Sequence, residues 1–319
     1  MRKNGGISAE DAAGNVRKKK RGIKNVSLLL IMLPTVAYIV IFHYLPMGGL
    51  IIAFKDYNSF EGMFGSPWAG DPLKHFKNFV TLPSFWPIIR NTLVLSVYSI
   101  AVYTVLPIVL ALFINEVKPK GYKKTIQTIS YAPYFISTVV AVGMLFTFSN
   151  QESGIFNTVK AFFGGERTNV MESKGWFSTI YVMSGLWQGW GWWAIIYVGT
   201  LSTVDPNLHE AAVLDGAGRL RRIWSINIPA IVPMALIMLI LAIGNMLNLG
   251  FEKIFLMQTD PTIPVSEVLS TYVYRVTFMT TKAQYSYAAA IGLFNSVVSM
   301  VLLIGANFAS KLFGGTSLW

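Results

Sequence analysis

Six long apolar runs separated by polar segments dominate the pattern of hydrophobic and polar positions along the chain. The runs extend over about residues 26–45, 89–114, 125–148, 177–198, 231–251 and 285–308. Each contains about 20 residues or more, which is the length at which an α-helix crosses the hydrocarbon core of a bilayer. The pattern therefore predicts an all-α integral membrane protein with six transmembrane helices.

The composition supports this class and excludes several kinds of site. Hydrophobic residues make up 53% of the 319 positions and charged residues only 13%, whereas soluble domains are about 25% charged. The chain has no Cys, which excludes disulfides and thiolate metal sites, and its three His residues (His43, His75 and His209) are scattered. We therefore predict no metal site.

The basic residues indicate the orientation of the chain. They are dense before the first run, between Lys118 and Lys124, and around residues 219–222, and they recur at Lys311 after the last run. Positive charge accumulates on the cytoplasmic side of membrane proteins, so we expect both termini to be cytoplasmic. The same distribution explains the net charge of +11 without a nucleic-acid partner, and the apolar runs imply contact with membrane lipid.

The runs divide the chain into four parts. Residues 1–25 are predicted to be a disordered, basic cytoplasmic tail, and residues 26–88 a first transmembrane helix with an external connection. Residues 89–310 would form the transmembrane core, and residues 311–319 a cytoplasmic C-terminal tail. A signal peptide is the alternative for the first run, but no small-x-small cleavage site follows it, so we expect the helix to be retained.

The polar segment 201–230, called the island below, carries too many ionisable residues to lie in hydrocarbon. Asp205 and Pro206 are typical of an N-cap and first helical position, so a helix is predicted over residues 206–214. Asp215-Gly216 should break it, and a second helical piece should follow over about residues 217–226, before Pro229 and Pro233 return the chain to the membrane. The spacing alone fits either an amphipathic loop on the bilayer or a rigid docking element.

The island contains Glu210-Ala211-Ala212, then Gly216 after three residues, and Ile226-x-Ile228-Pro229 after nine more. This pattern resembles the EAA motif of bacterial ABC importer permeases, with Ile228 where Leu is common. Five further segments are similar to the LplB-type branch of the maltose-type carbohydrate permeases, which is associated with oligo- and polysaccharides: Leu33-Pro34, Phe54-Lys55-Asp56-Tyr57, Arg90-Asn91-Thr92-Leu93, Phe251-Glu252-Lys253-Ile254-Phe255 and Ser317-Leu318-Trp319. The extra helices and large periplasmic insertion of the maltose permease are missing here.

The resemblance implies a type I importer permease with a MetI-like core. Its expected partners are a second permease subunit in a heterodimer, two copies of an ABC ATPase, an extracytoplasmic solute-binding protein and a carbohydrate substrate. No Gly-x-x-x-x-Gly-Lys-Ser/Thr phosphate loop occurs, so the chain should bind no cofactor itself, and ATP and Mg should be bound by the ATPase. The residues expected to dock the ATPase are Glu210, Ala211, Ala212, Asp215 and Gly216.

Polar and aromatic residues within the runs are candidates for a sugar path. The fourth run contains Trp187-Gln188-Gly189-Trp190-Gly191-Trp192-Trp193, and aromatic rings stack on the apolar faces of sugars. The resemblance to maltose-type permeases implies contacts at Gln188, Gly189 and Trp192; polarity within the bilayer adds Asn245, Asn248 and Asn295. The alternatives are an interfacial aromatic belt for the tryptophans and helix–helix hydrogen bonding for the asparagines.

Two other classes of function compete with an importer subunit. A stand-alone secondary transporter or channel should show inverted repeats and buried acidic relays, but no repeat is evident and only Glu252 comes near burial. A membrane enzyme should show a catalytic constellation within the runs, and none is present. The sequence therefore predicts a transport subunit of the cytoplasmic membrane that is not an enzyme, and a polyol, glycerol phosphate or peptide importer remains the alternative to a saccharide importer.

Overall fold

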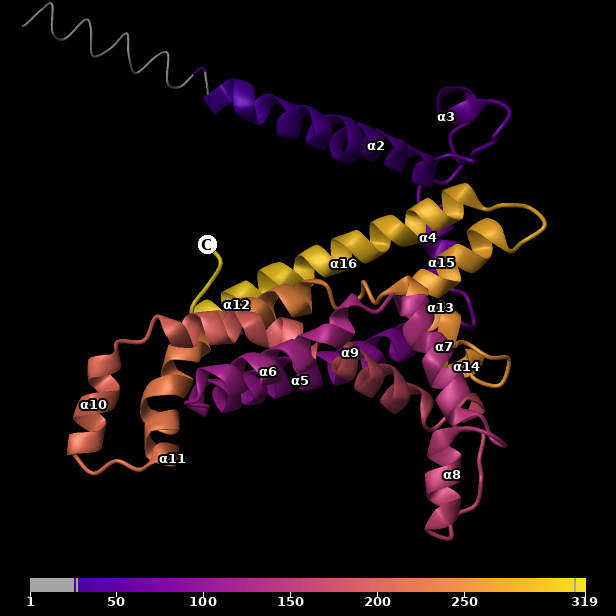
Figure 1. Ribbon diagram of the computed structural model, residues 1–319. Coiled ribbons are helices and arrows are strands. Elements are labelled where there is room, and N and C mark those ends of the chain that lie inside the picture. The colour runs from indigo at the N-terminus through magenta and orange to yellow at the C-terminus, as the bar shows by residue number, and fades with distance from the viewer. Residues whose placement is uncertain (1–25, 27, 313) are drawn as a thin grey trace, which may run out of the picture. The chain divides into compact units, whose positions relative to one another are not determined.

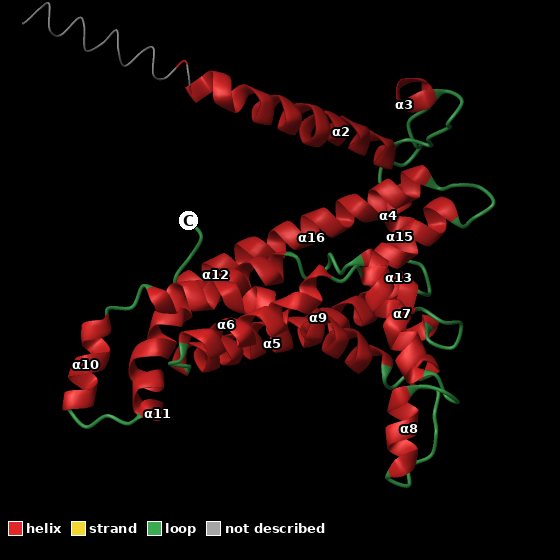
Figure 2. Ribbon diagram, in the orientation of Figure 1, coloured by secondary structure: helices red, strands yellow, loops and turns green. Residues whose placement is uncertain are grey.

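The computed structural model describes residues 26, 28–312 and 314–319, and these residues form helices joined by loops (Figures 1 and 2). The only extended pairing within this part of the chain is an isolated antiparallel bridge between Lys55 and Trp68. The chain divides into two compact units, residues 1–72 and 73–319. The predicted basic tail, residues 1–25, lies outside the described residues.

The first unit is built on one long helix over Leu28–Phe54. Its later part contains a π-helical turn, η1 (Val40–Tyr44), a short α-helical stretch, α2 (Leu45–Met47), and a 3₁₀-helix, η2 (Gly48–Phe54). Pro46 has no N–H and would clash with the carbonyl group of Phe42 in a regular helix. The wider π turn lies at this point and lets the helix continue to Phe54, nine residues beyond the predicted end of the run.

The loop after this helix is organised around Lys55. Its ammonium group donates to the carbonyl oxygens of Met63 (2.9 Å) and Phe64 (3.2 Å) in the short helix α3 (Gly62–Gly65). It also lies 5.2 Å from the ring centroid of Trp68. Lys55 is therefore buried but solvated by protein groups, which gives part of the Phe54-Lys55-Asp56-Tyr57 segment a structural role.

The second unit is a bundle of long helices with short helices at both ends. Its long helices are α5 (Phe85–Glu116), α9 (Phe177–Ser202), α12 (Ile228–Gly244) and α16 (Tyr285–Leu312), and α5 packs along α9 and α12 along α16. The shorter ones are α4 (Lys74–Val80), α6 (Lys120–Tyr131), η3 (Ala132–Phe135), α7 (Thr138–Ser149), α8 (Ile155–Phe162), η4 (Val170–Glu172), α10 (Pro206–Leu214), α11 (Arg219–Arg222), η5 (Ile223–Asn227), α13 (Phe251–Met257), α14 (Ile263–Ser266) and α15 (Leu269–Phe278).

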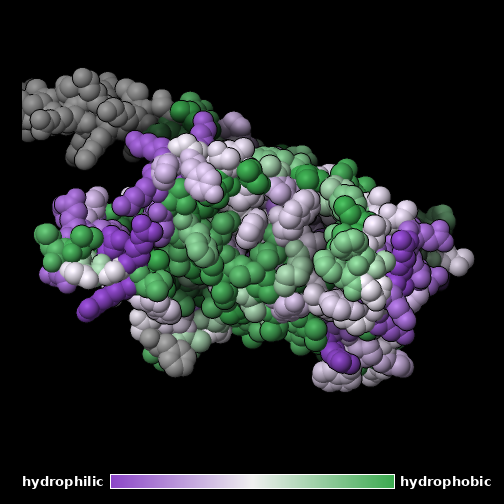
Figure 3. All heavy atoms as spheres, turned by 60° about the horizontal axis from the view of Figure 1, so that its bottom comes forward, coloured by the Kyte–Doolittle hydropathy of each residue, from purple (hydrophilic) through white to green (hydrophobic). Residues whose placement is uncertain are grey.

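The two ends of the second unit differ in the elements they carry. Helices α10 and α11 of the island lie at one end of the long helices, and α8, α13 and α14 lie at the other (Figure 1). Figure 3 shows a mainly hydrophobic belt between two more hydrophilic ends. This arrangement is that of a membrane domain whose polar segments emerge on opposite faces.

Length and hydropathy identify four candidate spans among the described residues: Leu28–Phe54, Phe85–Glu116, Arg219–Gly244 and Tyr285–Leu312. A fifth would be the bent pair of Lys120–Phe135 and Thr138–Ser149. Helix α9, with 26 residues, is long enough to cross a bilayer at about 1.5 Å per residue, but it is not among the candidates. The described residues are helical and include four or five helices long and apolar enough to cross a membrane, and the count of six spans remains a prediction.

The predicted continuous third span is wrong, because its two halves are bent by 96°. Pro133 opens the 3₁₀ turn η3, and Ser137 then starts a new helix by accepting a hydrogen bond from the Val140 N–H (3.3 Å). Proline and a Ser N-cap within five residues are together a strong signal for a helix end followed by a helix start.

The predicted limits of the fifth span are also wrong at both ends. Helix α12 ends at Gly244 rather than Phe251, where the Asn245 side chain donates to the Leu241 carbonyl oxygen (3.0 Å) and competes with the backbone. At the other end the helix is continuous from Arg219, through Pro229 and Pro233. The π turn η5 contains Ser225, whose carbonyl group the ring of Pro229 would otherwise meet, so the proline does not interrupt the helix.

The C-terminal segment folds back onto α16. The Leu318 N–H donates to the buried Asn307 side chain (2.7 Å), and the Ser310 hydroxyl donates to the Thr316 carbonyl oxygen (2.8 Å). Ser317-Leu318-Trp319 is thus attached to the last helix.

Candidate functional site

The island consists of α10, a tight turn at Gly216 and the beginning of the helix that leads into α12. At its start, Pro206 occupies the first helical turn and the Asp205 carboxylate accepts from the Asn207 N–H (3.0 Å). This confirms the predicted helix over residues 206–214 and its N-cap. The cap satisfies one backbone donor that a helix leaves free at its N-terminus.

The end of α10 is closed by a Schellman motif. The Ala217 N–H donates to the Ala212 carbonyl oxygen (2.8 Å), and the Gly216 N–H donates to the Val213 carbonyl oxygen (3.0 Å). Gly216 has φ of 77°, a left-handed conformation that favours glycine. The predicted turn at Gly216 is therefore explained by the backbone hydrogen bonds that terminate α10.

The predicted docking residues lie on an accessible helix. Glu210, Ala211, Asp215 and Gly216 are exposed, Ala212 is half-buried, and α10 contains no buried residue. Among the described residues no ion pair involves Glu210. Large apolar side chains are exposed on the same segment, including Leu214 (88%), Leu220 and Trp224.

Two of the three predicted path residues of α9, Gln188 and Trp192, contact the bend of the third span, and Gly189 lies against Trp193 of its own helix. The Gln188 amide donates to the Ile136 carbonyl oxygen (2.7 Å), in the two-residue break between η3 and α7. The Trp192 ring stacks on Tyr134 of η3 with a centroid distance of 4.4 Å and an interplanar angle of 5°. A Cβ atom added at Gly189 would lie 2.5 Å from the Trp193 ring, so glycine makes room for that ring.

Gly191 allows α9 to approach α6 closely, and it was not among the predicted site residues. A Cβ atom at Gly191 would lie 2.2 Å from the Ser130 carbonyl oxygen. Small residues at such positions let helices in membranes pack at short distance. The glycine between two tryptophans was the signal that could have identified this contact.

The three asparagines form a separate group. Asn248 accepts a hydrogen bond from the Asn295 amide of α16 (2.6 Å), while Asn245 caps α12. Among the described residues, neither a hydrogen bond nor a ring contact joins these asparagines to Gln188 or Trp192. The structure therefore brings together Gln188 and Trp192 at the bend, and separately Asn248 and Asn295.

Lys253 of α13 connects this helix to α9. Its ammonium group donates to the Tyr181 carbonyl oxygen (3.1 Å) and lies 5.1 Å from the Tyr181 ring centroid. Burial lowers the pKa of Lys253 to about 8. Gly185 leaves space mainly for the Tyr103 hydroxyl, since a Cβ atom there would lie 2.1 Å from it and 3.1 Å from the Lys253 nitrogen.

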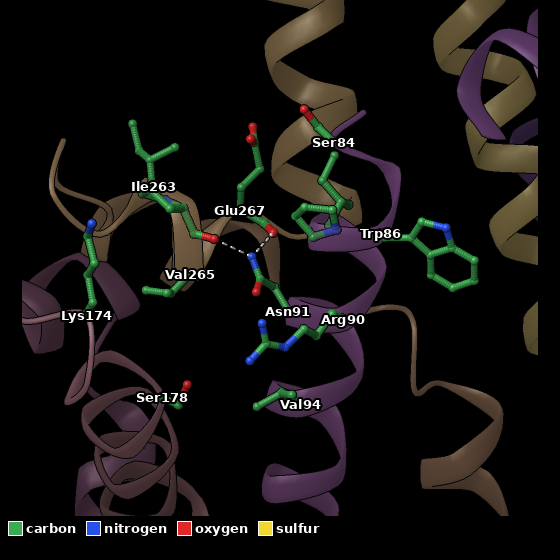
Figure 4. Close-up of a pocket in the computed structure, with 13 residues that line it drawn as sticks. Ser84, Trp86, Arg90, Asn91, Val94, Lys174, Ser178, Ile263, Val265 and Glu267 are labelled. Atoms are coloured by element: carbon green, nitrogen blue, oxygen red, sulfur yellow. Dashed lines mark hydrogen bonds between the residues drawn. The ribbon is translucent and has the colours of Figure 1, made fainter. Parts of the chain in front are cut away.

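A cavity of about 730 Å³ lies at the end of the second unit opposite the island, between α5, α9 and α14 (Figure 4). Arg90, Lys174, Ser178 and Glu267 are among its lining residues. None of these residues was predicted as part of a site. Arg90 belonged to a segment that the resemblance singled out, but no role followed from the sequence.

The protein family described as binding-protein-dependent transport system inner membrane component matches residues 5–313. The polygalacturonan/rhamnogalacturonan transport system permease protein YteP of Bacillus subtilis is 41% identical over 297 residues, which cover 93% of this chain and 91% of that protein. Protein LplB of the same organism is 40% identical over 292 residues, which cover 92% of this chain and 91% of that protein. The resemblance to LplB-type permeases is thereby confirmed.

Two crystal structures share the fold. One is of a bacterial ABC transporter involved in the import of the acidic polysaccharide alginate, with a TM-score of 0.82, 37% identity, and coverage of 92% of this chain and 98% of the matched chain. The other is of a bacterial alginate ABC transporter in complex with an alginate pentasaccharide-bound periplasmic protein. Its TM-score is 0.83 and its identity 36%, and the match covers 94% of this chain and 99% of the matched chain. The chain therefore belongs to the family of binding-protein-dependent transport system inner membrane components, as a multi-pass permease subunit and not an enzyme.

Proposed function

We propose that this chain is the transmembrane permease subunit of an ABC importer for oligosaccharides or polysaccharide fragments. The relatives named for polygalacturonan and rhamnogalacturonan and for alginate support this substrate class, because they match more than nine-tenths of the chain. The proposed complex contains a second permease subunit, two ABC ATPase subunits and an extracytoplasmic binding protein. ATP and Mg bind to the ATPase, and this chain holds no cofactor.

The proposed arrangement in the membrane has six spans with both termini in the cytoplasm. Helix α9 is the span that hydropathy does not identify, since Gln188, the four tryptophans and the glycines of this 26-residue helix lower its mean hydropathy. The basic residues at Lys118–Lys124 and Arg219–Arg222 then lie inside, as positive charge does in other membrane proteins. The island is cytoplasmic, and the cavity lined by Arg90 and Lys174 is external.

The observation that carries the proposal is the construction of the island. Helix α10 is capped at both ends by hydrogen bonds, and the chain after Gly216 continues as one helix from Arg219 to Gly244. An element connected in this way can transmit a displacement to α12, whereas a flexible loop would absorb it. Movement of the ATPase subunits would thereby alternate access to the path.

The surface of the island supports docking of another protein. Exposed Leu214, Leu220 and Trp224 provide apolar area, and clustered exposed apolar side chains mark interaction sites. We assign Glu210, Ala211, Ala212, Asp215 and Gly216 to the contact with the ATPase. Glu210 supplies a charge for a basic group of the partner, the two alanines allow close packing, and Gly216 makes the turn.

We further propose that Gln188, Gly189 and Trp192 line the sugar path, with Asn245, Asn248 and Asn295 nearer to α12 and α16. The side-chain nitrogen of Gln188 donates its hydrogen bond to the Ile136 carbonyl oxygen. The side-chain oxygen of Gln188 accepts no hydrogen bond from the described residues and can accept one from a sugar hydroxyl group. Trp192 keeps 42% of its surface exposed beside Tyr134. Broken membrane helices commonly line substrate sites, because their free backbone groups need a polar cavity.

The decisive experiment is purification of the complete complex and its reconstitution into proteoliposomes with a panel of oligosaccharides. The wild-type complex should import saccharides, and loaded binding protein should stimulate its ATPase. Glu210→Lys should keep membrane insertion but lower stimulated ATPase activity and uptake at least tenfold. Glu172→Lys, at an exposed position of η4, is the matched control. Full transport by Glu210→Lys would reject the docking role of Glu210. Uptake of peptides or polyols without uptake of saccharides would reject the proposed substrate class.

A further inference from the structure

The cavity between α5, α9 and α14 has the dimensions of a ligand site. Its volume of about 730 Å³ lies within the range of about 300–1,000 Å³ that small-molecule pockets occupy. Its lining combines apolar residues (Ile88, Val94, Ile263 and Val265) with hydroxyl groups and cations. The proposed orientation of the chain places it on the external face, where substrate arrives.

The wall of the cavity is fixed by the two residues that follow Arg90. The Asn91 amide donates to the carbonyl oxygens of Pro264 (3.0 Å) and Glu267 (3.1 Å), the two bonds drawn in Figure 4. The buried Thr92 hydroxyl accepts from the Leu269 N–H (3.1 Å) and donates to the Ile88 carbonyl oxygen (2.8 Å). Asn91 and Thr92 thus attach α14 and the start of α15 to α5.

Arg90, the first residue of the same segment, has no such structural role. Its guanidinium group extends into the cavity, and the Lys174 side chain lies on the opposite side of the cavity without pointing at Arg90 (Figure 4). Neither residue has an ion pair within the described part of the chain, and both side chains are exposed. Two cations at one cavity therefore keep their charge available for a ligand.

The acidic residue of the lining does not neutralise them. The Glu267 carboxylate is paired with Arg275 of α15 at 3.0 Å. Figure 4 shows it directed away from Arg90. Burial raises the pKa of Glu267, and the charge of Arg275 opposes that shift. The field in the cavity is therefore set mainly by Arg90 and Lys174.

We propose that this cavity binds an acidic sugar residue, with its carboxylate on Arg90 and with Lys174 adding positive charge on the opposite side of the cavity. The assignment rests on the proposed function and narrows its substrate class to saccharides that carry uronic acids. A guanidinium group can donate two parallel hydrogen bonds to one carboxylate, and Ser84 and Ser178 offer hydroxyl groups to the ring. The concave shape and the volume fit a sugar ring better than the single carboxylate side chain of a docked protein.

The test measures binding to the purified complete complex in lipid nanodiscs, without the binding protein. The probes are trigalacturonate and the same trisaccharide with its carboxyl groups reduced. Wild type should bind the acidic probe at least tenfold more tightly, and added salt should weaken only that binding. Arg90→Gln should lower the affinity for trigalacturonate about tenfold, because charge-assisted hydrogen bonds are lost. Lys174→Gln should lower it several-fold, because the cavity loses a positive charge. Lys282→Gln, an exposed lysine outside the lining, should change nothing.

Two results with the wild-type complex would overturn the proposal: no binding of trigalacturonate at millimolar concentration, or equal affinity for the two probes. Two results with Arg90→Gln would also overturn it. One is an equal loss of affinity for both probes, and the other is weakened docking of unloaded binding protein with unchanged affinity for trigalacturonate. Saccharide uptake by the wild-type complex is measured in parallel. If uptake is present and the charge preference absent, only the cavity assignment fails. If the complex imports no saccharide, the proposed function itself fails.

Discussion

The island and the central part of α9 are stabilised in different ways. In α10 no residue is buried, and the helix is defined by local groups: the Asp205 cap, Pro206 and the Gly216 turn. In α9, Gln188, Gly191 and Trp192 are defined by contacts with residues of α6, η3 and the break before α7, more than 50 positions earlier in the chain. One region is specified by its own sequence and the other by its neighbours.

This difference follows from what each region is proposed to do. A docking element must keep its surface available for another protein, so its shape has to come from caps and turns within the element. A path through a membrane needs polar groups inside a packed bundle, and those groups must be satisfied by other helices. Substitutions should therefore act on coupling in the island and on assembly or substrate passage in α9.

The largest effect is expected from Gly191→Val. Its Cβ atom would lie 2.2 Å from the Ser130 carbonyl oxygen, so the backbones of α9 and α6 would have to separate. Such overpacking costs about 3 kcal/mol of unfolding free energy. The measurements are the yield of monodisperse complex and its thermal midpoint. Gly199→Val is the matched control, because a Cβ atom at Gly199 of the same helix meets nothing within 4 Å. Equal midpoints for the two variants would show that α9 is less constrained than its contacts indicate.

A smaller but more specific effect is expected from Gln188→Leu. The side chains are similar in size, but the Ile136 carbonyl oxygen at the bend loses its donor. An unsatisfied polar group costs about 1–3 kcal/mol when buried. Uptake should fall about tenfold, while assembly and basal ATPase activity persist.

The kinetics of Gln188→Leu separate a path residue from a structural one. Gln284→Leu, at an exposed position just before α16, is the control and should leave uptake unchanged. If Gln188→Leu lowers the thermal midpoint but leaves the kcat and KM of uptake unchanged, Gln188 supports the bend and takes no part in the path.

The sequence was informative where the determinants are local. The apolar runs predicted the long helices, and Asp205-Pro206 and Gly216 predicted the limits of α10, because N-caps and left-handed turns depend on a few adjacent residues. The Pro133 and Ser137 pair carried the signal for the bend of the third span, but hydropathy alone merged its halves. The continuation through Pro229 depended on a π turn, which composition does not reveal.

The sequence was least informative where distant segments meet. Arg90 and Lys174 are 84 positions apart in the chain. The packing of α5 along α9, together with the attachment of α14 to α5 by Asn91, gives them a common cavity. For Asn248 and Asn295 the sequence left hydrogen bonding between segments open as the alternative to a path role, and the structure shows that they hydrogen-bond to each other; the sequence did not indicate which residues would pair. Such pairings depend on the packing of the bundle, for which a single sequence gives no direct measure.

The smallest effect is expected from Gly216→Ala, which tests whether the turn of the island transmits force through its geometry alone. A Cβ atom at Gly216 meets nothing within 4 Å, so the only penalty is the left-handed φ of 77°, about 1 kcal/mol. Stimulated ATPase activity should fall by a few-fold while expression and thermal midpoint stay near wild type. Gly218→Ala is the control, since Gly218 has φ of −66° and equally open surroundings. If both variants couple like wild type, the Schellman turn only ends α10, and coupling depends on the contact surface around Glu210.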